Sequence, residues 1–294
     1  MIKPYYERDG ITIYCGDCRV ILSQFEDGAF DMVFTDPPYG HNNNNGDLIQ
    51  SFQRPGDGTR GYCKGDGRPI ENDGPEANEL YREILPELYR LLGPGCCCCC
   101  CCGGGGPNPQ FARWALWMDE VFQFKQMIVW DKGQMGMGWH YRRSYETFLV
   151  GEKPGAACRW FDDTKAIENI IRPGDYGIRK IIPSADDHPT PKPVELAAHF
   201  IKLHTLPDDV VLDPFMGGGS TLVAAWNLGR RAVGIEISEE YCAMAVERLR
   251  QRSFFSIGLD DELKETYFKQ AVQNLEMVEK ESVYAPTLFD ISEF

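Results

Sequence analysis

Short apolar runs alternate with segments of helical character along most of the chain. The apolar runs predict strands at residues 10–15, 30–34, 96–102, 124–130, 145–150, 210–212 and 232–235. Helical spacing and helix-capping residues predict helices at residues 20–25, 76–92, 109–118, 194–203, 221–228 and 239–250. Strands that alternate with helices are typical of an open, mostly parallel α/β sheet with helices on both faces.

One expected helix contains a proline. Residues 76–92 place Leu80, Ile84 and Leu88 on one face, as an amphipathic helix does. Pro86 lacks the N–H group, and its ring crowds the preceding turn, so we expect it to kink the helix or to split it in two.

The cysteines favour a buried strand over disulfides or a metal site. Seven of the 12 cysteines form one run at residues 96–102, which glycines bound on both sides. Neighbours in a run cannot bridge a fold, and cysteine packs as a small hydrophobe, so we expect a central strand. Cys15 and Cys18 have a spacing found in zinc sites, but no second matching pair exists, so we expect no metal.

A stiff polar turn follows the expected strand at residues 30–34. It reads Asp36-Pro37-Pro38-Tyr39, and its two prolines fix their own backbone angles. The Asp36 carboxylate and the adjacent Pro37 carbonyl are two acceptors, and Tyr39 adds a flat ring. This set fits an exocyclic amino group on a planar base, although an ordinary proline-rich turn remains an alternative.

A glycine-rich bend follows the expected strand at residues 210–212. Residues 213–221 read DPFMGGGST, and glycines followed by a helix N-terminus let a ligand approach the backbone closely. A phosphate loop would need lysine before Ser220, and the dinucleotide pattern would need glycine at position 222, so both are excluded. Glu236 ends the next expected strand, where an acid can accept two ribose hydroxyls.

A third motif, residues 188–196 (HPTPKPVEL), lies between these two. With all three motifs in this order, residues 11–250 resemble the DNA amino-methyltransferases of the β group, in which the catalytic half precedes the cofactor half. The resemblance implies a circularly permuted, Rossmann-like fold that uses S-adenosyl-L-methionine. It implies the catalytic residues Asp36, Pro37, Pro38 and Tyr39, and the cofactor-binding residues Asp17, Lys192, Asp213, Phe215, Gly217, Gly219, Thr221 and Glu236.

The resemblance also implies the reaction. The methyl group would pass directly to the exocyclic N6 of an adenine extruded from DNA, because in this family aspartate before the prolines is commoner for adenine and serine for cytosine N4. Cytosine C5 chemistry needs a cysteine nucleophile, normally in a Pro-Cys pair, and the chain has no such pair. Methylation of cytosine N4, of RNA or of a protein glutamine stays open, as does a non-catalytic DNA-binding role.

The domain prediction is a catalytic domain at residues 1–252 and an acidic, helical or flexible tail at residues 253–294. Residues 41–78 lack a hydrophobic period and are expected to form a long loop that closes over the target base. Residues 151–187 are expected to carry a small target-recognition region.

Charge conflicts with a nucleic-acid partner, because the net charge is −14 and phosphate contacts normally come from Lys and Arg. A local basic stretch at residues 125–143 relieves the conflict, and we expect Lys132, Arg142 and Arg143 to contact double-stranded DNA. No apolar run reaches transmembrane length, so no membrane partner and a cytoplasmic location are expected. A homodimer and a paired nuclease, as in restriction-modification, stay open.

Overall fold

The computed structural model describes residues 2–40, 49–53, 60–64, 70–102, 111–133, 144–178 and 192–256. The chain divides into two compact units, Met1–Val246 and Glu247–Phe294. Of the second unit only residues 247–256 are described, as the end of helix α6 (Glu239–Ser256). The fold that follows is that of the first unit.

A nine-stranded sheet forms the centre of the first unit, in the order β1-β2-β11-β10-β3-β6-β8-β7-β9. The strands are β1 (Tyr6–Arg8), β2 (Ile11–Cys15), β3 (Phe30–Thr35), β6 (Leu92–Cys102), β7 (Gln123–Asp131), β8 (Tyr145–Glu152), β9 (Ile170–Ile171), β10 (Val210–Asp213) and β11 (Arg231–Glu236). The five strands from β2 to β6 are parallel to one another, whereas β1 runs antiparallel to β2, and β8 runs antiparallel to both β6 and β7. The amino end of β8 therefore meets the carboxyl ends of the parallel strands.

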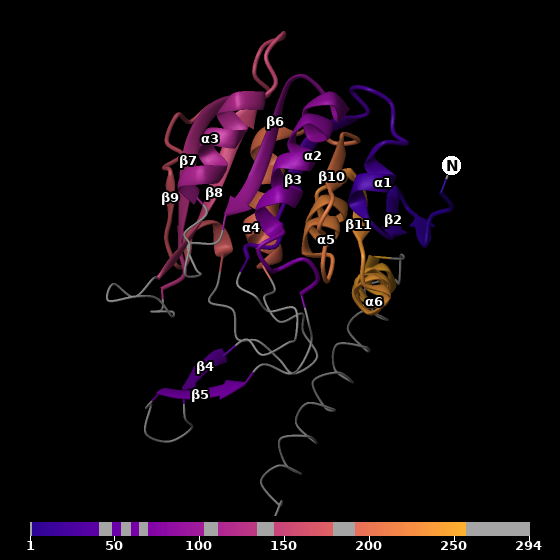
Figure 1. The fold of residues 1–294 in the computed structure, drawn as a ribbon, viewed down its shortest axis with the longest axis vertical. Coiled ribbons are helices and arrows are strands. Elements are labelled where there is room, and N and C mark those ends of the chain that lie inside the picture. The colour runs from indigo at the N-terminus through magenta and orange to yellow at the C-terminus, as the bar shows by residue number, and fades with distance from the viewer. Residues whose placement is uncertain are drawn as a thin grey trace, which may run out of the picture. The chain divides into compact units, whose positions relative to one another are not determined.

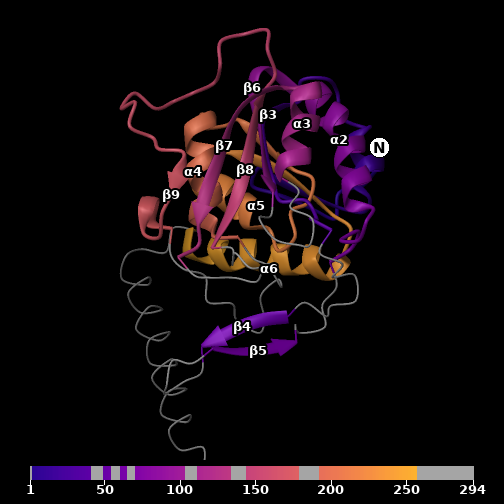
Figure 2. The same cartoon turned by 60° about the vertical axis from the view of Figure 1, so that its left-hand side comes forward.

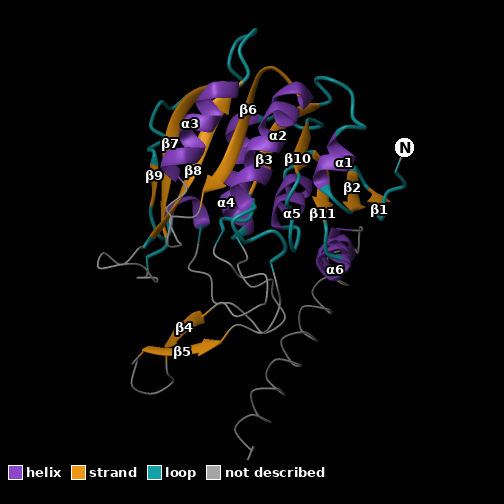
Figure 3. Cartoon of the chain, viewed as in Figure 1, coloured by secondary structure: helices purple, strands orange, loops and turns teal. Residues whose placement is uncertain are grey.

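Helices cover both faces of the sheet, and the strands lie side by side between the two helical layers (Figures 1, 2 and 3). One layer holds α1 (Cys18–Leu22), α2 (Ala77–Leu91) and α3 (Phe111–Val121), and the other holds α4 (Val194–His204) and α5 (Ser220–Asn227). This arrangement confirms the predicted α/β fold with a mostly parallel sheet. The permuted order of its halves stays a prediction, which rests on the order of the motifs.

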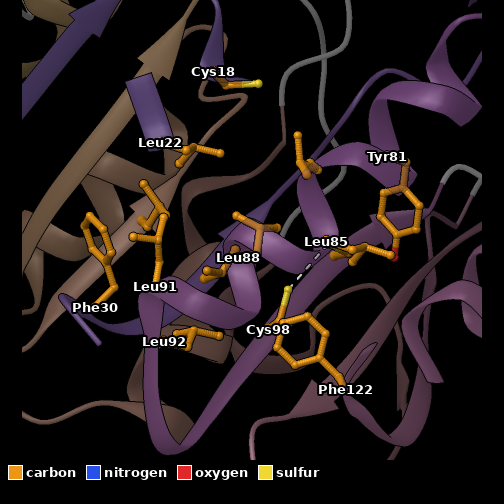
Figure 4. Packing of buried hydrophobic residues seen from close by; sticks show 14 of the residues in the cluster. Cys18, Leu22, Phe30, Tyr81, Leu85, Leu88, Leu91, Leu92, Cys98 and Phe122 are labelled. Atoms are coloured by element: carbon orange, nitrogen blue, oxygen red, sulfur yellow. Dashed lines mark hydrogen bonds between the residues drawn. The ribbon is translucent and has the colours of Figure 1, made fainter. Parts of the chain in front are cut away.

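The cysteine run lies in β6, inside the sheet between β3 and β8, as predicted. Cys98 and Cys100 belong to the core under α2 and α3, where Cys98 packs among Leu85, Leu88 and Phe122 (Figure 4). Side chains of a strand alternate between its faces, so a small side chain at every position lets both helical layers approach β6.

The opposite face of the sheet has an aromatic core. Phe34 of β3 stacks on Phe148 of β8, with ring centroids 5.6 Å apart, and Phe200 of α4 lies 4.8 Å from Phe148. These three rings fix α4 over β3 and β8. They therefore also fix Lys192 and Pro193, the residues that lead into α4.

One prediction of secondary structure was wrong, and for another the structure excludes one of its two alternatives. Residues 41–78 were expected to form a loop, but they include an antiparallel hairpin of β4 (Ile49–Gln53) and β5 (Arg60–Lys64). These strands form a separate two-stranded sheet, and their mixed polar sequences lack the alternation that a half-buried strand shows. Pro86 does not split its helix. Residues Ala77–Leu91 form one continuous helix, α2, and Pro86 lies on its exposed side.

Other features of the chain could not be predicted or lie outside the described residues. Strand β1 was not predicted, since three exposed or half-buried residues carry no hydrophobic signal. The predicted helix start at Asn108 and the tail beyond residue 256 lie outside the described part of the chain. Among the described helices, none combines the length and the apolar character that crossing a membrane requires.

Candidate active site

Four predicted acidic residues line one edge of the sheet. Asp17 follows β2, Glu236 ends β11, Asp213 ends β10 and Asp36 follows β3, and these four strands are consecutive neighbours (Figure 1). Because the strands are parallel, their carboxyl ends meet at this edge. The turn at residues 36–39, named the catalytic turn after its predicted role, and the glycine-rich bend are far apart in the sequence but adjacent in the fold.

A buried hydrogen bond joins the two motifs directly. Thr35 Oγ1, at the end of β3, donates to Asp213 Oδ1 over 2.8 Å, although the two residues are 178 positions apart. Asp213 Oδ1 also accepts the Phe215 N–H over 3.1 Å, and the Thr221 hydroxyl bonds to the same carboxyl group. Burial raises the pKa of Asp213 to about 7, and the bonds from Thr221, Thr35 and Phe215 oppose that rise. Asp213 thus holds the bend and its helix against β3.

Glu236 holds the glycine-rich bend in its conformation through hydrogen bonds from the backbone. The Gly217 N–H donates to Glu236 Oε2 over 3.1 Å, and the Ser238 N–H donates to Oε1 over 2.8 Å. Burial raises the pKa of Glu236, and these backbone bonds oppose the rise. The Ile237 N–H also bonds to this carboxylate, so three of its about four acceptor sites serve the backbone and one remains for a ligand hydroxyl.

Gly219 is required at the start of α5 for two reasons. Its φ is +80°, a conformation that side chains disfavour, and an added Cβ would lie 2.7 Å from the Cβ of Ala245. The bend can therefore adopt this shape only with glycine at this position.

Asp17 has a structural role in this fold. It caps α1 by accepting the Arg19 N–H over 2.9 Å, and its carboxylate forms an ion pair with the Arg19 guanidinium. The side-chain bond to Arg19 lowers the pKa of Asp17 despite its partial burial. The preceding Gly16 N–H donates to the Glu236 carbonyl over 2.9 Å, which places the cap beside the end of β11.

The catalytic turn is fixed from two sides. The Tyr39 hydroxyl bonds to Asp36 Oδ1 and lies 2.9 Å from the Cys101 sulfur of β6. Burial, with the charge of Asp36 next in importance, raises the pKa of Tyr39, so the hydroxyl stays protonated as a donor. Behind the turn, the buried carboxylate of Asp73 accepts the N–H groups of Tyr39 and Gly40 over 3.0 and 2.9 Å.

The Lys192 ammonium group, which comes from the segment leading into α4, contacts the catalytic turn. It forms an ion pair with Asp36 Oδ2 and lies 3.3 Å from Glu146 Oε2. Burial favours the neutral form of Lys192, but the charges of Asp36 and Glu146 outweigh it and raise the pKa. The predicted phosphate contact Lys132 donates to Glu146 Oε1 over 2.7 Å, whereas Arg142 and Arg143 lie outside the described residues.

Sequence reasoning missed Glu146 and Asp73. Glu146 is the second residue of β8, and it reaches the site because β8 runs antiparallel to β6, which no local pattern reveals. Asp73 lies within the interval that was expected to be a loop, with only an Asn-Asp-Gly turn pattern around it. The remaining described candidates lie in the two motifs that contain them: Pro37 and Pro38 in the turn, and Phe215, Gly217 and Thr221 in the bend.

Comparison with known proteins identifies the family. Residues 30–247 match the N6_N4_Mtase family model, which is described as DNA methylase. The chain is 29% identical over 265 residues to the type II methyltransferase M2.DpnII of Streptococcus pneumoniae, and the match covers 85% of this chain and 93% of that protein. It is 25% identical over 276 residues to the DNA adenine methyltransferase YhdJ of Escherichia coli, covering 83% and 84% of the two chains.

Solved structures share the fold. The DNA modification methylase TTHA0409 of Thermus thermophilus, in complex with S-adenosyl-L-methionine, superimposes with a TM-score of 0.57 at 24% identity, over 81% of this chain and 94% of its own. The cytosine-N4-specific PvuII DNA methyltransferase superimposes with a TM-score of 0.61 at 19% identity, over 92% and 95% of the two chains. Because the family model spans most of the catalytic unit, the chain belongs to the DNA methylases of the N6/N4 amino-methyltransferase family.

Proposed function

We propose that this protein transfers a methyl group from S-adenosyl-L-methionine to the exocyclic N6 of adenine in DNA. The observation that carries the proposal is the Thr35–Asp213 hydrogen bond, because it ties the acceptor turn to the glycine-rich bend. A methyl donor held at the bend and an amino group held at Asp36 would then share one edge of the sheet.

The bend fits the proposed cofactor. Glu236 is a largely buried carboxylate that three backbone N–H groups hold in place, and its remaining acceptor capacity suits a ribose hydroxyl. Gly217 and Gly219 both have positive φ, which gives the bend its conformation, and Phe215 and Thr221 flank them. Asp17 lies next to the end of β11, where the adenine ring of the cofactor is proposed to bind. When bound, the cofactor supplies an electrophilic methyl group.

The catalytic turn has to make a weak nucleophile reactive. The lone pair of an exocyclic amino group is delocalised into the base, so acceptors for its N–H bonds favour a lone pair localised on nitrogen. Asp36 and the Pro37 carbonyl are the proposed acceptors, and the stiff Pro37-Pro38 pair holds them in place. The Tyr39 hydroxyl occupies one lone pair of Asp36 and so orients the carboxylate. Stacking of the base on the Tyr39 ring stays a prediction.

The resemblance and the geometry indicate different contacts for Lys192. The resemblance implies a contact with the carboxylate of the cofactor, whereas the geometry directs its ammonium group to Asp36 and Glu146. An ammonium has three N–H bonds, so one remains for the cofactor carboxylate after these two carboxylates are served. A contact with the cofactor would therefore add to the pair with Asp36.

Adenine is the favoured target for two reasons. Aspartate precedes the two prolines, and the relative YhdJ is named as a DNA adenine methyltransferase. The competing cytosine-N4 reaction uses the same acceptor geometry, and the PvuII enzyme of that specificity shares the fold. The type II methyltransferase relatives also favour a restriction-modification setting, in which a nuclease partner and a homodimer remain to be tested.

The decisive experiment combines the full chain with labelled S-adenosyl-L-methionine and unmethylated genomic DNA, then identifies the modified nucleoside by mass. We expect N6-methyladenine, and N4-methylcytosine alone would end the adenine proposal. RNA and a glutamine-containing protein serve as parallel substrates and should stay unlabelled. Asp36→Ala should lower kcat by at least about 100-fold while cofactor binding by calorimetry changes little; equal activity would remove Asp36 from the mechanism.

A further inference from the structure

The catalytic aspartate belongs to a row of alternating charges. Asp36 pairs with Lys192, Lys192 with Glu146, and Glu146 with Lys132. The Lys192 and Glu146 side chains are only 10% and 15% exposed, so solvent screens the inner pair poorly. The sequence motifs contain Asp36 and Lys192, but nothing in them assigns a role to Glu146.

The residues that follow Lys192 in the sequence fix its position. Pro193, which follows it, is the N-cap of α4 and has its φ fixed by its ring. The aromatic contact of Phe200 with Phe34 fixes the same helix over β3. Lys192 is therefore set between β3 and β8 by the packing of α4, and its ammonium group reaches Asp36 from that position.

An unbalanced ammonium group at this position would oppose the reaction. Methyl transfer moves positive charge from the sulfonium to the amino nitrogen that Asp36 binds. At a separation of about 6 Å and an effective dielectric constant of about 20, one unit of positive charge slows such a step by at most about 100-fold, because the charge that moves starts on a nearby sulfonium. A carboxylate on the far side of Lys192 offsets that charge.

Glu146 meets the requirements for this counter-charge. Its Oε2 lies 3.3 Å from the Lys192 ammonium, and its Oε1 accepts from Lys132 over 2.7 Å. Burial by itself would raise the pKa of Glu146, but the two lysines outweigh it and lower the pKa to about 2. The group is therefore a carboxylate throughout the neutral pH range.

We propose that Glu146 is a positioning residue for methyl transfer, which offsets the charge of Lys192 and holds its ammonium group so that Asp36 keeps its orientation and the negative potential that it exerts on the amino nitrogen. The inference rests on the proposed function. It assigns to β8 a part in catalysis, through a residue that does not touch either substrate. It also assigns Lys132 to Glu146, where it anchors the carboxylate, in place of the predicted contact with DNA phosphate.

A double-mutant cycle tests whether Glu146 acts through Lys192. The variants are Glu146→Gln, Lys192→Met and their combination, assayed as full chains on unmethylated genomic DNA with labelled cofactor. Glu146→Gln should lower kcat by about 30- to 100-fold and change the dissociation constant of the cofactor by less than about 3-fold. In the Lys192→Met background, the same substitution should change kcat by less than about 3-fold.

Glu152→Gln is the matched control. Glu152 ends the same strand and pairs with Lys125 over 3.1 Å, and its side chain is 8% exposed compared with 15% for Glu146, but it lies at the opposite end of β8 from the catalytic turn. Its loss should lower the melting temperature about as much as the loss of Glu146 and leave kcat within about 2-fold. If Glu146→Gln does not fold, Lys132→Met tests the same chain of charges, and its loss of kcat should also depend on Lys192.

Two results would overturn the inference. Glu146→Gln could leave kcat unchanged, or it could lower kcat by the same factor with and without Lys192, which would mean a direct contact with the base or a general structural role. Wild-type protein that transfers no methyl group to any DNA would instead overturn the proposed function, and this inference with it. Wild-type activity with an uncoupled Glu146 would leave the proposed function intact.

Discussion

Thr35→Val tests the contact that joins the two halves of the site. Valine has the shape of threonine without the hydroxyl group, so the change removes the bond to Asp213 and leaves the packing of β3 almost unaltered. Thr35 is fully buried, and water cannot replace the lost donor. The Asp213 carboxyl group keeps its bonds from Phe215 and Thr221.

The expected loss depends on the charge of Asp213. A hydrogen bond to a charged acceptor contributes about 1.5–3 kcal/mol, and with two donors remaining we expect a loss of about 2 kcal/mol when Asp213 is ionised. When Asp213 is protonated the bond is neutral, and its loss should cost about 1 kcal/mol. For a domain of this size, 2 kcal/mol corresponds to a fall in Tm of about 4–8 °C.

The direction of the pH effect follows from proton linkage. The pKa of Asp213 is about 7 in the folded protein, compared with about 3.9 in an unfolded chain, so the folded state holds the extra proton between these values. The contribution of Asp213 to stability therefore decreases as the pH rises from about 4 to about 7. Loss of the Thr35 donor raises the pKa of Asp213 in the folded variant further. The contribution of Asp213 to the stability of the variant therefore continues to decrease to higher pH. Thr35→Val should thus cost more at pH 8.5 than at pH 5.5.

Urea unfolding at pH 5.5 and pH 8.5 measures the two losses. Thr35→Ser is the control, because serine keeps the donor and loses one buried methyl group, which should cost about 1 kcal/mol at both pH values. A loss for Thr35→Val that is the same at both pH values would refute the assigned bond to an ionisable Asp213. A variant as stable as wild type would show that the two motifs are not coupled through Thr35.

Three further substitutions probe the remaining supports of the site. Asp73→Ala should lower the free energy of unfolding by about 2–3 kcal/mol in urea and also reduce kcat, because two backbone donors of the catalytic turn lose a charged acceptor; unchanged kcat would separate Asp73 from the turn. Gly219→Ala should weaken cofactor binding in calorimetry and destabilise the protein by more than Gly229→Ala, since both glycines have positive φ but only the former Cβ would meet another atom; equal losses would mean that strain alone matters. Glu236→Gln should raise the dissociation constant of S-adenosyl-L-methionine by about 10- to 100-fold, and an unchanged constant would remove Glu236 from the proposed ribose contact.

The sequence predicts those parts of the fold that local chemistry determines. The strands ending at Thr35, Asp213 and Glu236 lie within one or two residues of their expected positions, because short apolar runs before acidic or glycine-rich turns are unambiguous signals. The seven cysteines do form a strand, since every side chain in the run is small and apolar, but β6 begins four residues earlier, at Leu92, so the glycines before the run lie inside the strand.

Features that depend on distant neighbours were not predictable. The ion pairs of Glu146 require β8 to be antiparallel to β6, and nothing in the sequence of β8 indicates in which direction the strand runs. Likewise, Lys192 lies in a motif associated with the cofactor, yet its position beside Asp36 follows from the packing of α4 on β3. Pro86 breaks a local rule without ending its helix, because its exposed side allows water to satisfy the carbonyl that it leaves unpaired.

The order of the strands explains why catalytic and cofactor residues meet at this one place. From β3 the chain continues through α2 to β6 on one side, whereas β10, the next strand on the other side, is reached only after α4. The sheet thus extends in opposite directions from the boundary between β3 and β10, and such a reversal leaves room for a ligand at the carboxyl ends of the strands. Thr35 and Asp213 bridge this boundary, with Asp36 beyond one and the glycine-rich bend beyond the other. A methyl donor and an amino group bound on its two sides would face the same boundary, so we expect catalysis to depend on the few side chains that fix it.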